Sequence, residues 1–70
     1  MEEYTHTIKR QGAGWAIVGI DESYASLQEA WDEARHDLLH VGGGRIVVVD
    51  RHGRVRAAET VAVHDLGHAN

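Results

Sequence analysis

The chain has 70 residues, a formal net charge of −4 and no cysteine, so we expect one domain with a small core and neither disulfides nor thiolate zinc sites. The negative charge disfavours nucleic acid as a partner, because that binding depends on clustered positive charge. Since the longest apolar run, residues 46–49, is too short to cross a membrane and the polar start does not match a secretory leader, we expect a cytoplasmic protein.

The first twenty residues predict a β-hairpin. Residues 4–10, YTHTIKR, alternate and are rich in β-branched and aromatic side chains, and residues 15–20, WAIVGI, have a similar composition. The two glycines of residues 11–14, QGAG, supply the turn between these strands. Gly19, inside the second strand, predicts a bulge or a close backbone approach.

A helix is predicted over residues 27–41. Ser26 and Glu29 have the spacing of a capping box, in which each side chain accepts a hydrogen bond from a free backbone N–H group of the first turn. Gly42 suits the left-handed position that ends a helix. Apolar residues then recur at helical spacing and define one face: Leu27, Ala30, Trp31, Ala34, Leu38 and Val41.

The following segment predicts two more strands, over residues 45–49 and 54–63, joined by a type I turn with a glycine bulge at residues 50–53, DRHG. The order is β-β-α-β-β, an α+β fold with a four-stranded, antiparallel-type sheet and one helix on one face. We expect a single domain over residues 1–63 and a flexible tail over residues 64–70. The expected core consists of Trp15, Leu27, Trp31, Leu38, Ile46 and Val48.

One helix covers only one face of a sheet, yet the third strand is apolar on both faces. Ile46 and Val48 should face the helix, so Val47 and Val49 should lie on the uncovered face. An exposed apolar face is typical of an association surface. We therefore expect a homodimer, formed through Val47 and Val49 or through an edge strand.

The stretch RHDLLHVGGGR, residues 35–45, raises two site hypotheses. Its glycines follow the helix, and the helix C-terminus has the wrong polarity for phosphate, so we interpret them as a helix stop and a flexible joint. His36 and His40 share one helical face and are weak candidates for a metal site. A favourable interaction of these histidines with the helix dipole explains them more simply, and we assign no metal and no cofactor.

Two further groups of residues are candidate sites. His64 and His68, in the tail, also have ligand-like spacing, and incidental metal binding is the simpler interpretation. Arg51, Arg54 and Arg56 crowd the second hairpin, with Arg54 and Arg56 expected on one strand face. This patch could contact phosphates or an acidic partner, or it could be a solvated strand face. The sequence has no cysteine nucleophile, and its clustered carboxylates fit the solvated surface of the predicted helix. We therefore expect that the protein is not an enzyme.

The combined segments resemble a known family. GAGW followed by AIV, the helix with EAWDEAR, and GGRIVVVDRHGRVR are similar to the small bacterial proteins grouped as domain of unknown function 2188, over about residues 4–60. The tail and GIDESYAS depart from that pattern. The resemblance implies a β-β-α-β-β fold and no established activity, and it transfers no catalytic residue. The first half, with SLQEA at the helix start, also resembles HicB-type antitoxins, whose separate DNA-binding segment has no counterpart here.

The sequence therefore predicts a small, non-catalytic binding module, homodimeric and able to contact a protein partner. One alternative is an antitoxin-like or phage-type inhibitor that neutralises a basic protein, because the helix is acidic. A second alternative is a nucleic-acid-associated protein that uses the arginine-rich hairpin.

Overall fold

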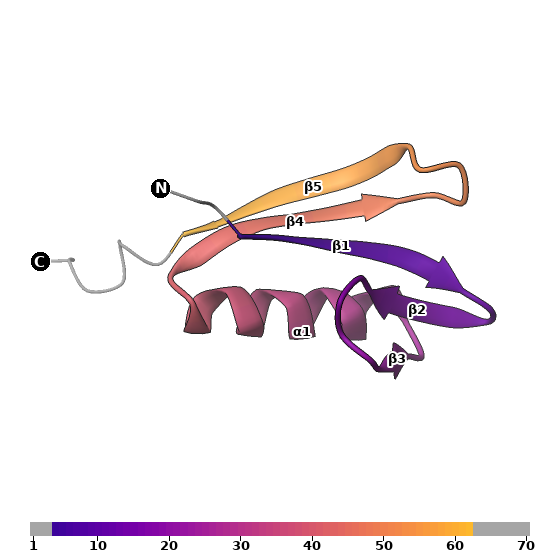
Figure 1. The fold of residues 1–70 in the computed structure, drawn as a ribbon, viewed down its shortest axis with the longest axis horizontal. Helices are drawn as coiled ribbons and strands as arrows, with labels where there is room; N and C mark the ends of the chain where they lie inside the picture. Colours follow the sequence, from indigo (N-terminus) through magenta and orange to yellow (C-terminus); the bar gives the residue numbers. More distant parts are fainter. Residues whose placement is uncertain (1–3, 63–70) are drawn as a thin grey trace, which may run out of the picture.

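Residues 4–62, the part that the computed structural model describes, form a five-stranded sheet with one helix on one face (Figure 1). The strands lie in the order β3-β2-β1-β4-β5. No helix in this part of the chain is long and apolar enough to cross a membrane. The elements are β1 (Tyr4–Gln11), β2 (Gly14–Ile17), β3 (Ser23–Tyr24), α1 (Leu27–His40), β4 (Gly43–Val49) and β5 (Val55–Ala62).

The α+β class and the single helix are confirmed, but the prediction of four antiparallel strands was wrong. β1 and β4 form a parallel pair in the centre of the sheet, with His6 opposite Ile46. The chain reaches this arrangement because α1 carries it from one side of β1 to the other, as a parallel pair requires. The two outer pairs that flank this centre, β1 with β2 and β4 with β5, are antiparallel.

The fifth strand follows a second strand that ends earlier than predicted. β2 ends at Ile17, and Gly19 has a φ of 93° in a turn, not in a strand as predicted. The chain then returns as β3, where Tyr24 pairs with Trp15. The Tyr24 hydroxyl donates to Glu22 at 3.0 Å, and burial together with this carboxylate raises the pKa of Tyr24 to about 12.

The helix begins at its predicted cap. Ser26 Oγ accepts a hydrogen bond from the Glu29 backbone N–H at 3.1 Å, and the Glu29 carboxylate accepts one from the Ala25 N–H at 3.2 Å. The capping box is therefore present, with its second bond shifted by one residue from the usual partner. The helix ends at His40, one residue before the predicted end.

The three glycines after the helix have different roles. Gly42, with a φ of 98°, ends the helix as predicted. Gly43 and Gly44 belong to β4, and the prediction of a flexible joint is wrong for them. A Cβ on Gly43 would lie 2.7 Å from the Val61 carbonyl oxygen, and one on Gly44 would collide with the carbonyl oxygen of Tyr4. These glycines allow the backbones of β1, β4 and β5 to approach closely.

The core lies between the sheet and α1. Of the six predicted core residues, Leu38, Ile46 and Val48 are buried, whereas the two tryptophans and Leu27 lie partly exposed at its border. Their position at the border matters for the site below, because it leaves aromatic surface in contact with solvent. The buried set also includes residues absent from the prediction: Ile8, Ile17 and Val61.

Val47 lies on the sheet face opposite α1, as the alternation predicted, whereas Val49 also lines the groove beside Trp15 that is described below. Their neighbours Ile46 and Val48 are buried against the helix, whereas Val47 and Val49 are half-buried. The homodimer that these residues suggested stays a prediction. Residue 63, at the end of the predicted domain, and the predicted flexible tail over residues 64–70 lie outside the described residues.

Candidate functional site: a basic groove beside Trp15

The turn between β4 and β5 is organised by Asp50. Asp50 Oδ1 accepts hydrogen bonds from the backbone N–H groups of His52 at 2.8 Å and Arg54 at 2.9 Å. The Gly53 N–H donates to the Asp50 carbonyl oxygen at 3.0 Å, and Gly53 has a φ of 81°. These bonds agree with the predicted type I turn extended by a glycine.

A register shift next to this turn determines where the arginines point. Val48 pairs with Ala57, but Val49 pairs with Val55, so Arg56 is an extra residue in β5. Such a bulge re-aims side chains, and it places Arg56 in the same groove as Val48 and Ala57. Arg54 precedes β5 and does not line that groove. Arg54 was expected within the fourth strand and instead precedes it, and the expectation that Arg54 and Arg56 share one face stays a prediction.

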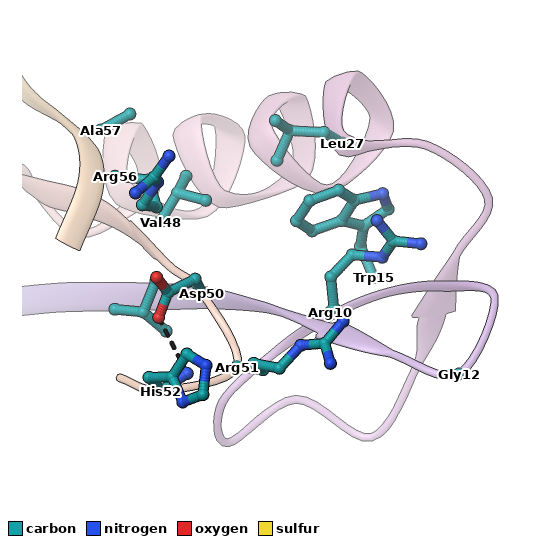
Figure 2. Close-up of a pocket in the computed structure, with 11 residues that line it drawn as sticks. Arg10, Gly12, Trp15, Leu27, Val48, Asp50, Arg51, His52, Arg56 and Ala57 are labelled. Atoms are coloured by element: carbon teal, nitrogen blue, oxygen red, sulfur yellow. Dashed lines mark hydrogen bonds between the residues drawn. The ribbon is translucent and has the colours of Figure 1, made fainter. Parts of the chain in front are cut away.

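The groove has a volume of about 720 Å³ and lies on the helix side of the sheet, at the end that carries both hairpin turns (Figure 2). This volume is in the range of small-ligand sites, which is about 300–1,000 Å³. Both apolar and charged side chains line it. Its lining consists of Arg10, Gly12, Trp15, Leu27, Val48, Val49, Asp50, Arg51, His52, Arg56 and Ala57.

Arg10 and Trp15 form one wall of the groove. The two residues are opposite each other in the β1–β2 pair, and the Arg10 guanidinium carbon lies 5.1 Å from the centre of the Trp15 ring. This distance is typical of a cation–π contact. Figure 2 shows the Arg10 side chain alongside the indole, so the aromatic ring holds the guanidinium in place.

The charge in the groove is positive. Asp50 is the one carboxylate among the lining residues, against Arg10, Arg51 and Arg56. The backbone N–H groups of Arg54 and His52, with the charges of Arg56 and Arg51, hold the pKa of the Asp50 carboxyl below its ordinary value. Among residues 4–62, none of the three lining arginines forms an ion pair with a carboxylate. The groove therefore has an excess of cations that an external anion could balance.

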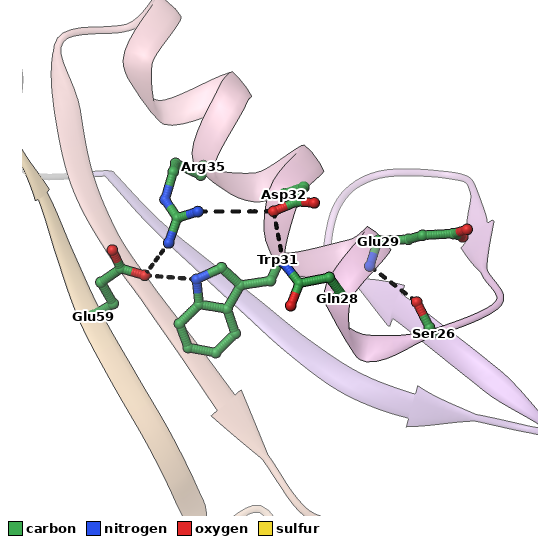
Figure 3. A network of polar contacts seen from close by, with 7 residues as sticks. All are labelled: Ser26, Gln28, Glu29, Trp31, Asp32, Arg35 and Glu59. Atoms are coloured by element: carbon green, nitrogen blue, oxygen red, sulfur yellow. Dashed lines mark hydrogen bonds and ion pairs between the residues drawn. The ribbon is translucent and has the colours of Figure 1, made fainter.

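A second cluster, between α1 and β5, contrasts with the groove (Figure 3). Glu59 Oε1 accepts hydrogen bonds from Trp31 Nε1 at 2.6 Å and Arg35 Nη2 at 2.7 Å. These donors and the Arg35 charge hold the pKa of the Glu59 carboxyl below its ordinary value. Asp32 lies 3.8 Å from the Arg35 guanidinium. The polar groups of this cluster are paired within the chain, so it serves the fold.

The two histidines that were weak metal candidates, His36 and His40, both lie on α1. The rings of His36 and His40 lie 5.4 Å apart, and within residues 4–62 no group of three metal-ligating side chains occurs. His64 and His68 lie outside the described residues. His6 is instead held by Asp37, with 2.6 Å between His6 Nε2 and the carboxylate, which connects β1 to α1.

Of the three predicted binding residues, Arg51 and Arg56 lie in the groove and Arg54 does not. Arg10 and Trp15 were missed as site residues, because they come from the other hairpin. The predicted turn at residues 11–14 could have indicated that Arg10 and Trp15 are neighbours, because strand pairing across this turn places the two side chains opposite each other. Their approach to Arg51 and Arg56 follows from the central parallel pair, which the sequence did not reveal.

Comparison with protein-family models, with curated proteins and with solved structures finds no match to this chain. The resemblances to domain of unknown function 2188 and to HicB-type antitoxins therefore stay predictions.

Proposed function

We propose that this chain is a small, non-catalytic binding module whose basic groove holds an anionic group of a protein partner. The observation that carries the proposal is the meeting of Arg10, Arg51 and Arg56 around one groove with a single carboxylate. Guanidinium groups bind carboxylates through short, charge-assisted hydrogen bonds, two at a time where the geometry allows. Cations gathered in a concave surface also attract anions from solution.

The residues of the groove support binding without catalysis. None of the side chains that line it carries a hydroxyl or thiol nucleophile. Asp50 is engaged by two backbone N–H groups, which favour its charged form and weaken it as a general base. His52 is the other lining side chain of a type that can act as a general acid or base, and the lining offers it no hydroxyl or thiol to activate.

Two features favour a protein over a nucleic acid. Proteins that bind single strands stack bases on aromatic side chains, but the Trp15 ring is in contact with Arg10. The groove also borders the start of α1 at Leu27, and the exposed helix surface that follows carries Glu29, Asp32 and Glu33. A long polyanion would be repelled there, whereas one or two carboxylates of a protein segment would not.

Calorimetric titration with a hexaglutamate peptide tests the proposal. We expect binding that weakens with added salt, and at least a tenfold loss of affinity in the Arg10→Ala/Arg56→Ala double variant. The matched control is Lys9→Ala/Arg45→Ala, which removes the same charge from exposed side chains. Lys9 and Arg45 each lie next to buried residues in their strands, Ile8 and Ile46, so they point to the opposite face.

An equal loss in both double variants would mean general charge attraction and would contradict a defined site. Two further probes decide the chemical class. Hexaglutamine should not bind, because it lacks the charge. A six-nucleotide oligothymidylate should bind more weakly than hexaglutamate. Tighter binding of the oligonucleotide, lost in the groove variant alone, would assign the groove to nucleic acid and overturn the choice of a protein partner.

A further inference from the structure

The outer edge of β5 is a second candidate binding surface, beside the basic groove. The sheet ends at β5, and Figure 1 shows this strand along one border of the sheet. Of its eight residues, Val61 alone is buried, and Val55 is 62% exposed. Within residues 4–62 no segment pairs with this edge. Its backbone N–H and C=O groups are therefore available to another strand.

The two edges of the sheet differ in how they are protected. The opposite edge is β3, which has only two residues, and very short edge strands resist pairing with other chains. β5 has eight residues, with small side chains at Ala57, Ala58 and Thr60 that leave the backbone accessible. Its one acidic residue, Glu59, is bonded to Trp31 and Arg35. The bulge at Arg56 disturbs only the beginning of the strand.

This edge and the groove adjoin each other. Arg56 and Ala57, which line the groove, are residues of β5. In an added strand, the residue opposite Ala57 would point to the same face as Ala57, because directly opposed residues share a face about 4.5–5.5 Å apart. That side chain would enter the groove next to Arg56.

The charges select the kind of strand. A carboxylate at that position would meet the cations of the groove, and a lysine or arginine would be repelled by them. We propose that β5 receives an extended acidic peptide of a partner protein as a sixth strand, with one carboxylate of the peptide in the basic groove. This inference rests on the proposed function and adds the conformation and the docking position of the ligand.

Three eight-residue peptides separate the two claims. The parent probe is acetyl-(Thr-Glu)4-amide, the second replaces each Glu with Gln, and the third keeps Glu but carries methyl groups on its four central backbone nitrogens. Methylation removes the donors that strand pairing needs and leaves the charge intact. Affinity is measured by calorimetry, and hydrogen–deuterium exchange of the full chain reports which amides become protected.

We expect the methylated peptide and the Gln peptide each to bind at least tenfold more weakly than the parent. The parent should slow amide exchange in β5 at least tenfold and leave β3 unchanged. Among protein variants, Ala57→Glu should weaken binding of the parent at least tenfold, because its charge enters the groove. Ala58→Glu is the matched control, since it adds the same charge one residue along, on the other face of the strand.

The opposite results are distinguishable. If the methylated peptide binds as tightly as the parent and β5 amides exchange as before, strand addition is wrong and the basic groove remains. If the Gln peptide binds as tightly as the parent, the anion-binding function itself fails. If β5 amides are already protected in a dimer without peptide, a second copy of the chain occupies the edge and the proposal is overturned.

Discussion

The two tryptophans of this protein lie in two regions that each combine an indole ring with an arginine. The regions differ in whether a carboxylate of the chain pairs with that arginine. Trp31 and Arg35 both donate to Glu59, so that region is closed by a carboxylate of the chain. Trp15 is in contact with Arg10, but among the described residues no carboxylate pairs with that arginine. An aromatic–arginine pair therefore becomes part of the fold when the chain supplies the anion. It becomes a candidate site when the chain does not.

Replacing each tryptophan by phenylalanine gives the largest expected difference between the regions. Trp31→Phe removes the donor to Glu59, and we expect the free energy of unfolding to fall by about 2 kcal/mol, in the range of a hydrogen bond to a charged group. Trp15→Phe keeps a ring for Arg10, and we expect a fall of about 0.5 kcal/mol, typical of a conservative apolar change. Urea denaturation of both variants measures the difference. Equal losses would remove the distinction between the regions.

The pH dependence of Glu59→Gln tests the carboxylate that closes the Trp31 region. Because the folded state lowers the pKa of Glu59, its carboxylate contributes stability above its ordinary pKa of 4.5, and this contribution is lost as the pH falls through the lowered value. We expect the variant to be less stable by about 0.5–1 kcal/mol at pH 7, a modest figure for a part-exposed pair.

The measurement is a series of urea denaturation curves between pH 7 and pH 3. The difference between wild type and Glu59→Gln should shrink in the acidic part of this range. A difference that stays constant with pH would show that the charge of Glu59 is unimportant, and that only the shape of the side chain matters.

The smallest effect on the fold is expected outside both regions, at Val47. Val47→Lys adds a charge to the uncovered sheet face, and we expect the free energy of unfolding to change by about 0.5 kcal/mol or less. If the predicted homodimer forms through this face, native mass spectrometry will show a dimer for wild type and a monomer for the variant. A dimer that persists in Val47→Lys would place the interface elsewhere, and a wild-type monomer would end the homodimer hypothesis.

Features of the fold that depend on neighbouring residues were predictable from the sequence. Ser26 and Glu29 predicted the start of the helix, because the cap is a hydrogen bond between residues three apart in the sequence. Asp50 and Gly53 predicted the turn between β4 and β5, because they too are joined by a hydrogen bond between residues three apart. In both cases the signal and the structure lie within one turn of the chain.

The features that the sequence did not predict depend on contacts between segments that are distant in the chain. The parallel pairing of β1 with β4 leaves no pattern in the local sequence, so the sheet type was predicted wrongly. For the same reason the sequence did not predict that Arg10 and Arg56 line one groove. The bulge at Arg56 is set by how β5 fits the end of β4, and simple alternation along the sequence does not reveal it. The sequence does not show which side chains lie together where strand register, not composition, decides it.

The central β1–β4 pair also has a consequence for the order of folding. Each hairpin can form from residues close in sequence, but the parallel pair joins Thr5 to Arg45 and Ile8 to Val48 across the whole helix. Contacts of such long sequence separation form slowly, because loop-closure entropy opposes them. The two walls of the groove come from different hairpins, so a nascent or truncated chain would carry the arginines without the site. Ligand binding would then report complete folding.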